Sequence, residues 1–252
     1  MADTVLVTGA SSGFGKAIAE KFASQGFNLI ITGRRAELLD QLKKELEASF
    51  GISVWTSVFD IRNKAAVDAA VSAIPDRYLP IRILVNNAGL ALGRDYFDNA
   101  AMADWEQMID TNLKGLLYIS KAVLPFLKQA TLPHIFNIGS TAAKEVYEKG
   151  NVYCATKHAV DAISKAMRID LLQHKIKVTA IHPGAADTAF SMVRFKGDGQ
   201  KASAVYEGYE PLHAEDIAHI IWFCASQPAH VCINDLVVTC TAQANSFLTY
   251  KG

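Results

Sequence analysis

The sequence predicts a single α/β domain built on a doubly wound parallel sheet, with about seven strands and helices on both faces. Short apolar segments rich in Val and Ile alternate with longer segments of helical period along the whole chain. The apolar segments show little polar alternation, as expected for strands covered on both faces. Repeated strand–helix alternation favours parallel strands joined by right-handed crossovers. Because no stretch rich in Pro, Gly or Ser divides residues 1–252, we expect one domain.

Seven segments are expected to be strands and six to be helices. The strands comprise residues 4–9, 28–33, 53–60, 81–89, 134–140, 177–184 and 235–240. The helices comprise residues 13–26, 35–49, 63–73, 102–129, 151–174 and 214–226. Residues 185–213 contain the stretch RFKGDGQKAS and have little strand character. A segment of that length without a clear element is usually functional or mobile, so we expect it to form a lid over a substrate.

The composition argues against nucleic-acid and membrane binding. Twenty-five basic residues balance 25 acidic ones, whereas such surfaces typically have a clustered basic excess. No apolar stretch approaches the ~18 residues that span a bilayer, and MADTVLVTGA lacks the pattern of a secretory leader. The four cysteines form no CxxC pair and the seven histidines no HExxH pair. We therefore expect a cytoplasmic protein without a metal site.

A glycine-rich turn joins the first expected strand to the first expected helix. Its glycines are Gly9, Gly13 and Gly15, with the spacing GxxxGxG. Glycines let the backbone turn tightly and approach a pyrophosphate, which binds at the N-terminus of a helix. Three glycines in a turn can also be purely structural, but their position between strand and helix favours a dinucleotide site.

The residues after the second strand indicate which nucleotide binds. NAD-binding proteins place an Asp or Glu about 20 residues past the glycines, on the ribose 2′-OH. Here the strand ends at Gly33, and Arg34 and Arg35 follow. Two guanidinium groups suit a 2′-phosphate, which predicts NADP rather than NAD. The alternative is that both arginines simply begin a solvated helix.

Two further strand ends are expected at the same edge of the sheet. Asp60 ends the third strand and is placed to meet the adenine, with Ile61 beside it. The sequence NNAG at 86–89 ends the fourth strand, where open α/β sheets bind ligands. Its Asn and Gly residues permit a tight turn beside a cofactor.

Tyr153 and Lys157 form the most distinctive chemical pair. On a helix they lie one turn apart on the same face. A free tyrosine has a pKa near 10, too high for efficient proton transfer at neutral pH. We expect the positive charge of Lys157, joined by that of an oxidised nicotinamide, to lower the pKa of Tyr153, so that the phenol acts as a general acid or base. YxxxK pairs also occur by chance on helix faces.

Ser140 and Asn112 support this interpretation. Ser140 follows the fifth expected strand and so lies at the carboxyl edge, where its hydroxyl can bind a substrate oxygen. Asn112 interrupts an otherwise apolar helix. Its amide is either an ordinary polar helix residue or a group that kinks the helix and holds a water connecting Lys157 to solvent.

TGASSGFG, NNAG, Asn112, Ser140 and YCATK stand in the order and spacing of the short-chain dehydrogenase/reductase family, which the chain resembles over almost its entire length. The resemblance implies a Rossmann fold, catalysis without metal or covalent intermediate, and a catalytic tetrad of Asn112, Ser140, Tyr153 and Lys157. It also implies that residues 182–184 and Thr188 close over the nicotinamide. The expected cofactor-binding residues are Gly9, Ser11, Ser12, Gly13, Phe14, Gly15, Arg34, Arg35, Asp60, Ile61, Asn87, Ala88, Gly89, Tyr153, Lys157, Pro183, Gly184 and Thr188.

NNAGLALG, NVYCATK, SMVRFKGD and PAHVCIND look like the branch of the family that oxidises 3-hydroxy acids and reduces 3-oxo acids. That branch includes serine and L-allo-threonine dehydrogenases and malonic semialdehyde reductases, and it implies NADP and a homotetramer. The chain departs from the pattern at Lys144, Glu145 and Tyr147, at His182, and in AADTAF after it. Because these segments line the substrate side, the departures concern the substrate more than the chemistry.

A short hydroxy acid needs a cation to hold its carboxylate. Arg194 and Lys196, on the expected lid, are the candidates, and we expect Ser140, Tyr153, Tyr147 and Arg194 to bind substrate. The alternative is that RFKGDGQK is a solvated loop.

Three functions remain open. The first is NADP-dependent oxidation of a small 3-hydroxy acid of the serine, allo-threonine or 3-hydroxypropionate type. The second is NADPH-dependent reduction of an uncharged ketone, a ketoester or a 3-oxoacyl group. The third is a non-catalytic NADPH-binding sensor, which would have no need of a proton donor.

Overall fold

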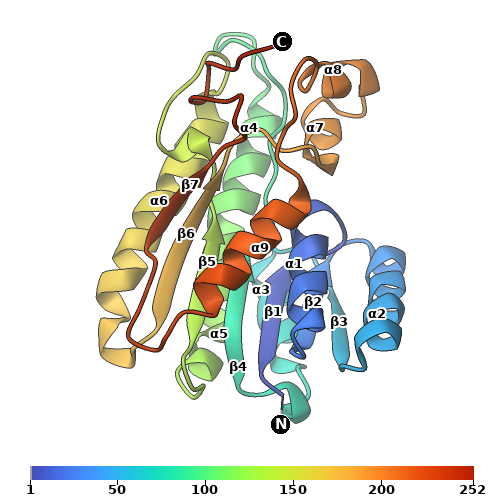
Figure 1. Cartoon of the computed structure of the whole chain (residues 1–252), viewed down its shortest axis with the longest axis vertical. Helices are drawn as coiled ribbons and strands as arrows, with labels where there is room; N and C mark the ends of the chain where they lie inside the picture. Colours follow the sequence, from blue (N-terminus) through green and yellow to red (C-terminus); the bar gives the residue numbers. More distant parts are fainter. Residues whose placement is uncertain (1) are drawn as a thin grey trace.

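The computed structural model describes residues 2–252, which form one seven-stranded parallel sheet (Figure 1). The strand order is β3-β2-β1-β4-β5-β6-β7. The strands are β1 (Thr4–Thr8), β2 (Asn28–Gly33), β3 (Val54–Val58), β4 (Ile81–Asn86), β5 (His134–Ile138), β6 (Lys177–Pro183) and β7 (Asp235–Val238). The predicted fold class is confirmed. Several strands end earlier than expected, because their polar and glycine-containing ends leave the sheet to form loops.

Helices cover both faces of the sheet (Figure 1). One face packs against α1 (Gly13–Ser24), α2 (Ala36–Phe50) and α9 (Ala214–Ala225). The other packs against α3 (Lys64–Ser72), α5 (Leu116–Leu127) and α6 (Asn151–Asp170). Every strand except β7 contributes to both cores, because successive side chains point to opposite faces. Val5 and Val7 belong to the first core and Leu6 to the second.

The strand order reverses between β1 and β4. From β1 the chain proceeds through β2 to β3, and it then returns to place β4 on the other side of β1. The loops that follow β1 and β4 therefore run in opposite directions and leave a crevice at the carboxyl ends of these strands, where open α/β sheets bind ligands.

A single helical stretch, predicted at 102–129, contains an irregular turn. It consists of α4 (Met102–Ile109), the π-helical segment η2 (Asp110–Gly115) and α5. The π turn contains Asn112, the residue expected to disturb this helix. Single π turns are frequent at functional sites. Among the helices of residues 2–252, none is long and apolar enough to cross a membrane.

Residues 185–213 contain two short helices, where the sequence suggested little regular structure. These are α7 (Ala189–Arg194) and α8 (Gly199–Ala204), which stand beyond the carboxyl ends of the strands (Figure 1). Each begins with a side-chain cap: Thr188 accepts from the amide of Phe190 at 3.2 Å, and Asp198 from that of Lys201 at 3.1 Å. Both caps are local sequence signals that the pattern of apolar residues did not reveal.

Candidate active site

A cleft of about 760 Å³ opens at the carboxyl edge of the sheet. It is lined by the loops after the strands, by the N-terminal part of α6 and by the segment 183–209 that carries α7 and α8. All of the predicted cofactor-binding and substrate-binding residues line it except Gly15. Of the predicted tetrad, Ser140, Tyr153 and Lys157 line it, and Asn112 lies outside its wall. The structure therefore brings nearly all the predicted residues to one place.

The glycine-rich turn has a shape that only glycine accommodates. Gly9 and Gly13 have φ angles of +66° and +53°, in the left-handed region. A Cβ on Gly15 would stand 2.3 Å from the carbonyl oxygen of Gly9. Gly15 thus lets α1 pack against the turn, and Gly9 and Gly13 shape the wall of the cleft at the start of that helix. Such a cradle fits a pyrophosphate.

Arg35 is directed across this turn. Its Nη2 donates to the hydroxyls of Ser11 and Ser12, at 2.7 Å each. Arg34 and Arg35 both line the cleft and are exposed. The side chain of Arg35 therefore faces the nucleotide end of the cleft, although its backbone begins α2.

Asp60 lies in the cleft wall but is already paired. Its carboxylate accepts from Nε of Arg62 at 3.0 Å and from Nη2 at 2.5 Å. These hydrogen bonds hold the pKa of Asp60 below its usual value. Arg62, which the sequence did not single out, thus fixes the carboxylate that is expected beside the adenine.

Lys157 is buried, and its ammonium is engaged with the backbone. Its Nζ donates to the carbonyl oxygen of Ile138 at 2.9 Å, and lies 5.9 Å from the centroid of the Tyr153 ring. Burial lowers the pKa of Lys157 to about 8. The helical spacing does place the two residues on one face of α6, as predicted.

Lys157 alone does not lower the pKa of Tyr153, and the lowering expected with an oxidised nicotinamide stays a prediction. Burial raises the pKa of Tyr153 well above its usual value, and the neighbouring Tyr147 adds to this effect. The Ser140 hydroxyl and the Arg194 guanidinium oppose the shift. Desolvation prevails because Tyr153 is buried.

Asn112 supports the cleft from behind. Its amide oxygen accepts from the backbone N–H of Leu90 at 2.8 Å, and its nitrogen donates to the carbonyl of Leu90 at 2.8 Å and to the Thr156 hydroxyl at 3.1 Å. The side chain therefore joins the π turn to the loop after β4 and to α6. The amide thus has a structural role, and the expected water relay to Lys157 stays a prediction.

Arg194 occupies the substrate end of the cleft. Its Nη2 donates to the hydroxyl of Tyr147 at 3.0 Å, and its guanidinium carbon lies 5.6 Å from the ring centroids of both Tyr147 and Tyr153. Its Nε is buried and has no hydrogen-bond partner within residues 2–252. A half-buried cation with an unused buried donor, beside Tyr153, fits an anionic ligand.

Lys196 does not lie at the substrate end of the cleft. Its Nζ pairs with Asp104 on α4 at 2.8 Å, and in the described part of the chain Lys196 is not among the lining residues. Of the two cations expected to hold a carboxylate, the structure therefore supports Arg194 alone. Arg94, which follows the NNAGLALG motif, lines the cleft instead and was missed.

The C-terminal segment also forms part of the wall. Five of its residues line the cleft, namely Gln243, Ser246, Phe247, Thr249 and Lys251. The backbone N–H of Ser246 donates to Glu145 at 2.8 Å, which ties the segment to the loop before α6. One indirect signal could have predicted this, because β7 is parallel to the other strands and so must end at the same edge.

One group of histidine and carboxylate side chains within residues 2–252 has the spacing of metal ligands: Asp161, His182 and Asp235. The ammonium of Lys144 already binds both carboxylates, at 2.9 and 2.6 Å. We therefore describe the group as an ion-pair cluster.

Comparison with known proteins identifies the family of the chain. The sequence profile described as short chain dehydrogenase matches residues 3–199. The chain is 48% identical over 231 residues to an NADP-dependent 3-hydroxy acid dehydrogenase of Salmonella typhi, covering 91% of this chain and 92% of that protein. It is 43% identical over 245 residues to sulfoacetaldehyde reductase 2 of Chromohalobacter salexigens, covering 97% and 96%.

A solved structure is also similar. The closed form of a serine dehydrogenase complexed with NADP⁺ superposes with a TM-score of 0.92 and 44% identity, over 99% of each chain. The chain is therefore similar to these proteins in sequence, and to the serine dehydrogenase also in fold, over nearly its whole length. The chain belongs to the short-chain dehydrogenase family.

Proposed function

We propose that this protein is an NADP-dependent oxidoreductase that transfers a hydride between the nicotinamide and the carbonyl or hydroxyl carbon of a small 3-hydroxy acid. The observation that carries the proposal is the position of Arg194. This cation stands beside Tyr153 in the same cleft as the glycine-rich turn. A cation at that distance selects substrates that combine an anionic group with a nearby hydroxyl or carbonyl.

NADP fits the nucleotide end of the cleft. The turn formed by Gly9, Gly13 and Gly15 would hold the pyrophosphate, and Arg34 and Arg35 would hold the 2′-phosphate. When bound, NADP supplies or accepts the hydride. The NADP-dependence of the Salmonella relative and the NADP⁺ complex of the serine dehydrogenase support the same cofactor.

The proton chemistry belongs to Ser140, Tyr153 and Lys157. In reduction, the hydroxyls of Ser140 and Tyr153 would hold the carbonyl oxygen, and Tyr153 would donate its proton to it. The raised pKa of Tyr153 keeps the phenol protonated in the free protein, and the positive charge of an oxidised nicotinamide would favour the phenolate as the proton leaves. Lys157, fixed by the carbonyl of Ile138, would hold its positive charge beneath the ring as the phenolate forms.

The anionic group of the substrate would bind Arg194. The unused Nε and the Nη2 that faces Tyr147 could together bind two oxygens of a carboxylate. A sulfonate would bind by the same contacts, which is consistent with the similarity to a sulfoacetaldehyde reductase. The arrangement disfavours uncharged ketones, because Arg194 would then keep a buried donor without a partner.

The assembly and location form part of the proposal. We propose, from the family resemblance, that the protein is a homotetramer and that it is cytoplasmic. All four cysteines are unpaired in the described structure, which supports a reducing compartment.

A substrate screen tests the proposed function. Purified protein would be assayed for reduction of NADP⁺ and NAD⁺ with L- and D-serine, the threonine isomers, 3-hydroxypropionate, 3-hydroxybutyrate, 2-hydroxyethanesulfonate and 2-propanol. We expect turnover with NADP⁺ and with at least one anionic or zwitterionic hydroxy acid in preference to 2-propanol. Equal kcat/KM values for 2-propanol and the best acid, or for the two cofactors, would contradict the proposal.

A further inference from the structure

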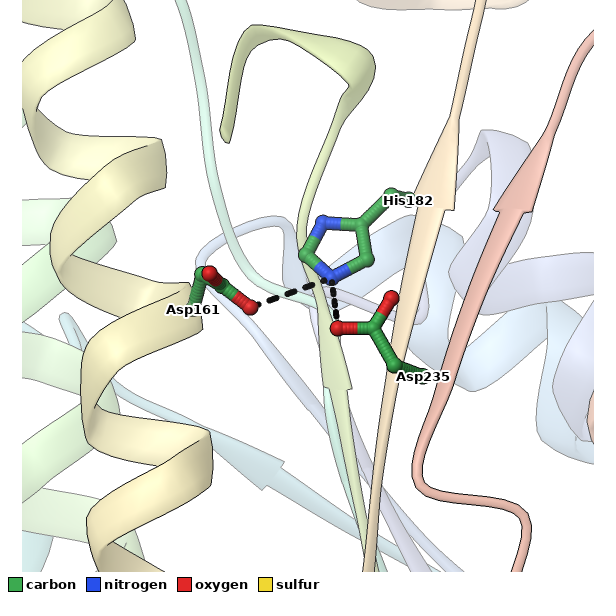
Figure 2. A group of neighbouring side chains, drawn as sticks. All are labelled: Asp161, His182 and Asp235. Atoms are coloured by element: carbon green, nitrogen blue, oxygen red, sulfur yellow. Dashed lines mark ion pairs between the residues drawn. The ribbon is translucent and has the colours of Figure 1, made fainter. Parts of the chain in front are cut away.

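Lys144 and His182, two of the departures from the family pattern, meet in one partly buried cluster. Lys144 follows the 3₁₀ turn η3 (Thr141–Ala143), and His182 lies on β6. Nε2 of His182 stands 3.6 Å from Oδ1 of Asp161 on α6 and 3.5 Å from Oδ2 of Asp235 on β7 (Figure 2). Nζ of Lys144 binds the same two oxygens. The imidazole and the ammonium therefore share one pair of carboxylates.

The other side of the His182 ring faces Ser140. Nδ1 lies 3.3 Å from the carbonyl oxygen of Ser140. A carbonyl oxygen can only accept, so this contact is a hydrogen bond only when Nδ1 carries the proton. In that tautomer Nε2 has a lone pair directed at the carboxylates, and it has no hydrogen-bond partner among residues 2–252.

Lys144 stabilises the tautomer of His182 that carries its proton on Nδ1. A neutral imidazole beside two free carboxylates would place its proton on the nitrogen that faces them. Lys144 binds both carboxylates, and Lys165 binds the second oxygen of Asp161 at 2.7 Å. Burial and the charge of Lys144 lower the pKa of His182, while Asp235 and Asp161 act in the opposite direction. The proton of the neutral ring is thereby left for the carbonyl of Ser140.

The contact with His182 adds to other hydrogen bonds that restrain Ser140. The Ser140 hydroxyl accepts from the backbone N–H of Ala142 at 3.1 Å, and its carbonyl also accepts from Ala143 at 2.8 Å. A Cβ on Gly139 would stand 2.3 Å from Nδ1, so the ring lies directly against the backbone before Ser140. His182 itself has no exposed surface. The ring cannot turn away without moving the backbone that carries Ser140.

We propose that His182 is a positioning residue, which holds the backbone of Ser140 through its Nδ1–H and so aims the Ser140 hydroxyl at the substrate oxygen. The inference rests on the proposed function, in which Ser140 contacts that oxygen. His182 lies outside the cleft wall and is not a member of the tetrad, so this role is additional to those of the tetrad. The Lys144–Asp161–Asp235 cluster serves this role by setting the tautomer of the ring.

Two variants at one position test the proposal. His182→Leu removes the donor, and we expect kcat to fall about tenfold, because small misplacements of a reacting group are costly. NADPH affinity, measured by fluorescence titration, should stay within about twofold, since the side chain of His182 lies outside the cleft wall. His182→Asn places an amide N–H where Nδ1 stands, and we expect it to restore kcat to within about threefold of the original even if its melting temperature stays lower.

Failure of the positioning role of His182 can be distinguished from failure of the proposed function. Unchanged kcat in His182→Leu, or equal losses in the Leu and Asn variants, would overturn the positioning role. Ser140→Ala sets the scale: if it loses no activity, the role of Ser140 in the proposed function fails, whatever the His182 variants do.

A measurement on the unsubstituted protein covers the case in which His182→Leu does not fold. Protein labelled with ¹⁵N-histidine would be examined by long-range imidazole NMR, and the His182 resonances among the seven histidines identified by their loss in His182→Asn. We expect a proton on Nδ1. A neutral ring protonated on Nε2 alone would overturn the proposal.

Discussion

The guanidinium carbon of Arg194 lies 5.6 Å from the ring centroid of Tyr153. One residue on α7 therefore stands close enough both to hold a substrate anion and to favour the phenolate of the proposed proton donor. An anionic substrate that binds Arg194 would partly neutralise its charge and so weaken its effect on the pKa of the phenol. Substrate binding and the acidity of Tyr153 are therefore coupled through this one guanidinium.

Replacing Arg194 with Ala should separate charged from uncharged substrates. We expect kcat/KM for the best hydroxy acid to fall roughly 10- to 100-fold, because a charge-assisted pair of hydrogen bonds is lost. Turnover of 2-propanol should change less than about threefold. Steady-state kinetics with both substrates makes the comparison, and Lys196→Ala is the matched control, since Lys196 pairs with Asp104. Equal losses on acid and alcohol would count against an anion site at Arg194.

Removing the phenolic hydroxyl of Tyr153 should abolish most of the chemistry. We expect Tyr153→Phe to lower kcat roughly 10²- to 10⁴-fold, the usual range for a general acid. NADPH binding, followed by fluorescence, should be nearly unchanged because the ring remains. Tyr147→Phe removes the neighbouring hydroxyl and should cost much less. Activity retained in Tyr153→Phe would refute the proton-donor role.

The two arginines after β2 should determine the choice of cofactor. Arg34→Ala and Arg35→Ala should each lower kcat/KM for NADP⁺ roughly tenfold or more, because each removes a cation from the 2′-phosphate. Values for NAD⁺, which lacks that phosphate, should hardly change. Lys44→Ala, an exposed residue of α2, controls for a general loss of positive charge. If neither arginine variant reduces the ratio of kcat/KM for NADP⁺ to kcat/KM for NAD⁺, the 2′-phosphate site is elsewhere.

His134 should make the fold sensitive to acid. It is buried on β5, where Nε2 contacts the hydroxyl of Thr179 at 2.7 Å, and burial lowers its pKa from 6.5 to about 3. The free energy of unfolding is therefore fully maintained above pH 6.5 and decreases as the pH falls toward 3, because the unfolded chain takes up the proton first. At pH 5 the loss from this residue is about 2 kcal/mol.

Denaturant unfolding at pH 7 and pH 5 checks this expectation. His134→Gln keeps a donor for Thr179 but does not titrate, so its stability should fall less between the two pH values. A fall as large as that of the unsubstituted protein would show that other groups cause the acid sensitivity.

The parts predicted correctly from the sequence are those that local patterns determine. The apolar strands, the glycine-rich turn and the Tyr153–Lys157 spacing each depend on residues a few positions apart. Because parallel strands end at one edge, their terminal residues could be expected to meet there. The cleft residues predicted from strand ends, such as Asp60 and Asn87, follow from this rule.

What could not be predicted depends on contacts between distant segments. Lys196 and Arg194 were equivalent in the sequence, and only the pairing of Lys196 with Asp104 distinguishes them. The pKa of Tyr153 depends on burial that no local spacing reveals. His182 was recognised as unusual, but its partners Asp161 and Asp235 come from two other elements.

The π turn at residues 110–115 makes the geometry of the cleft depend on chain length within one helix. A π turn accommodates one more residue than an α turn over the same rise. Deleting one residue there would restore regular winding and rotate Asn112 relative to α5, so that its amide would no longer meet Leu90. Insertions and deletions at this point should therefore be tolerated far less than substitutions on the same helix.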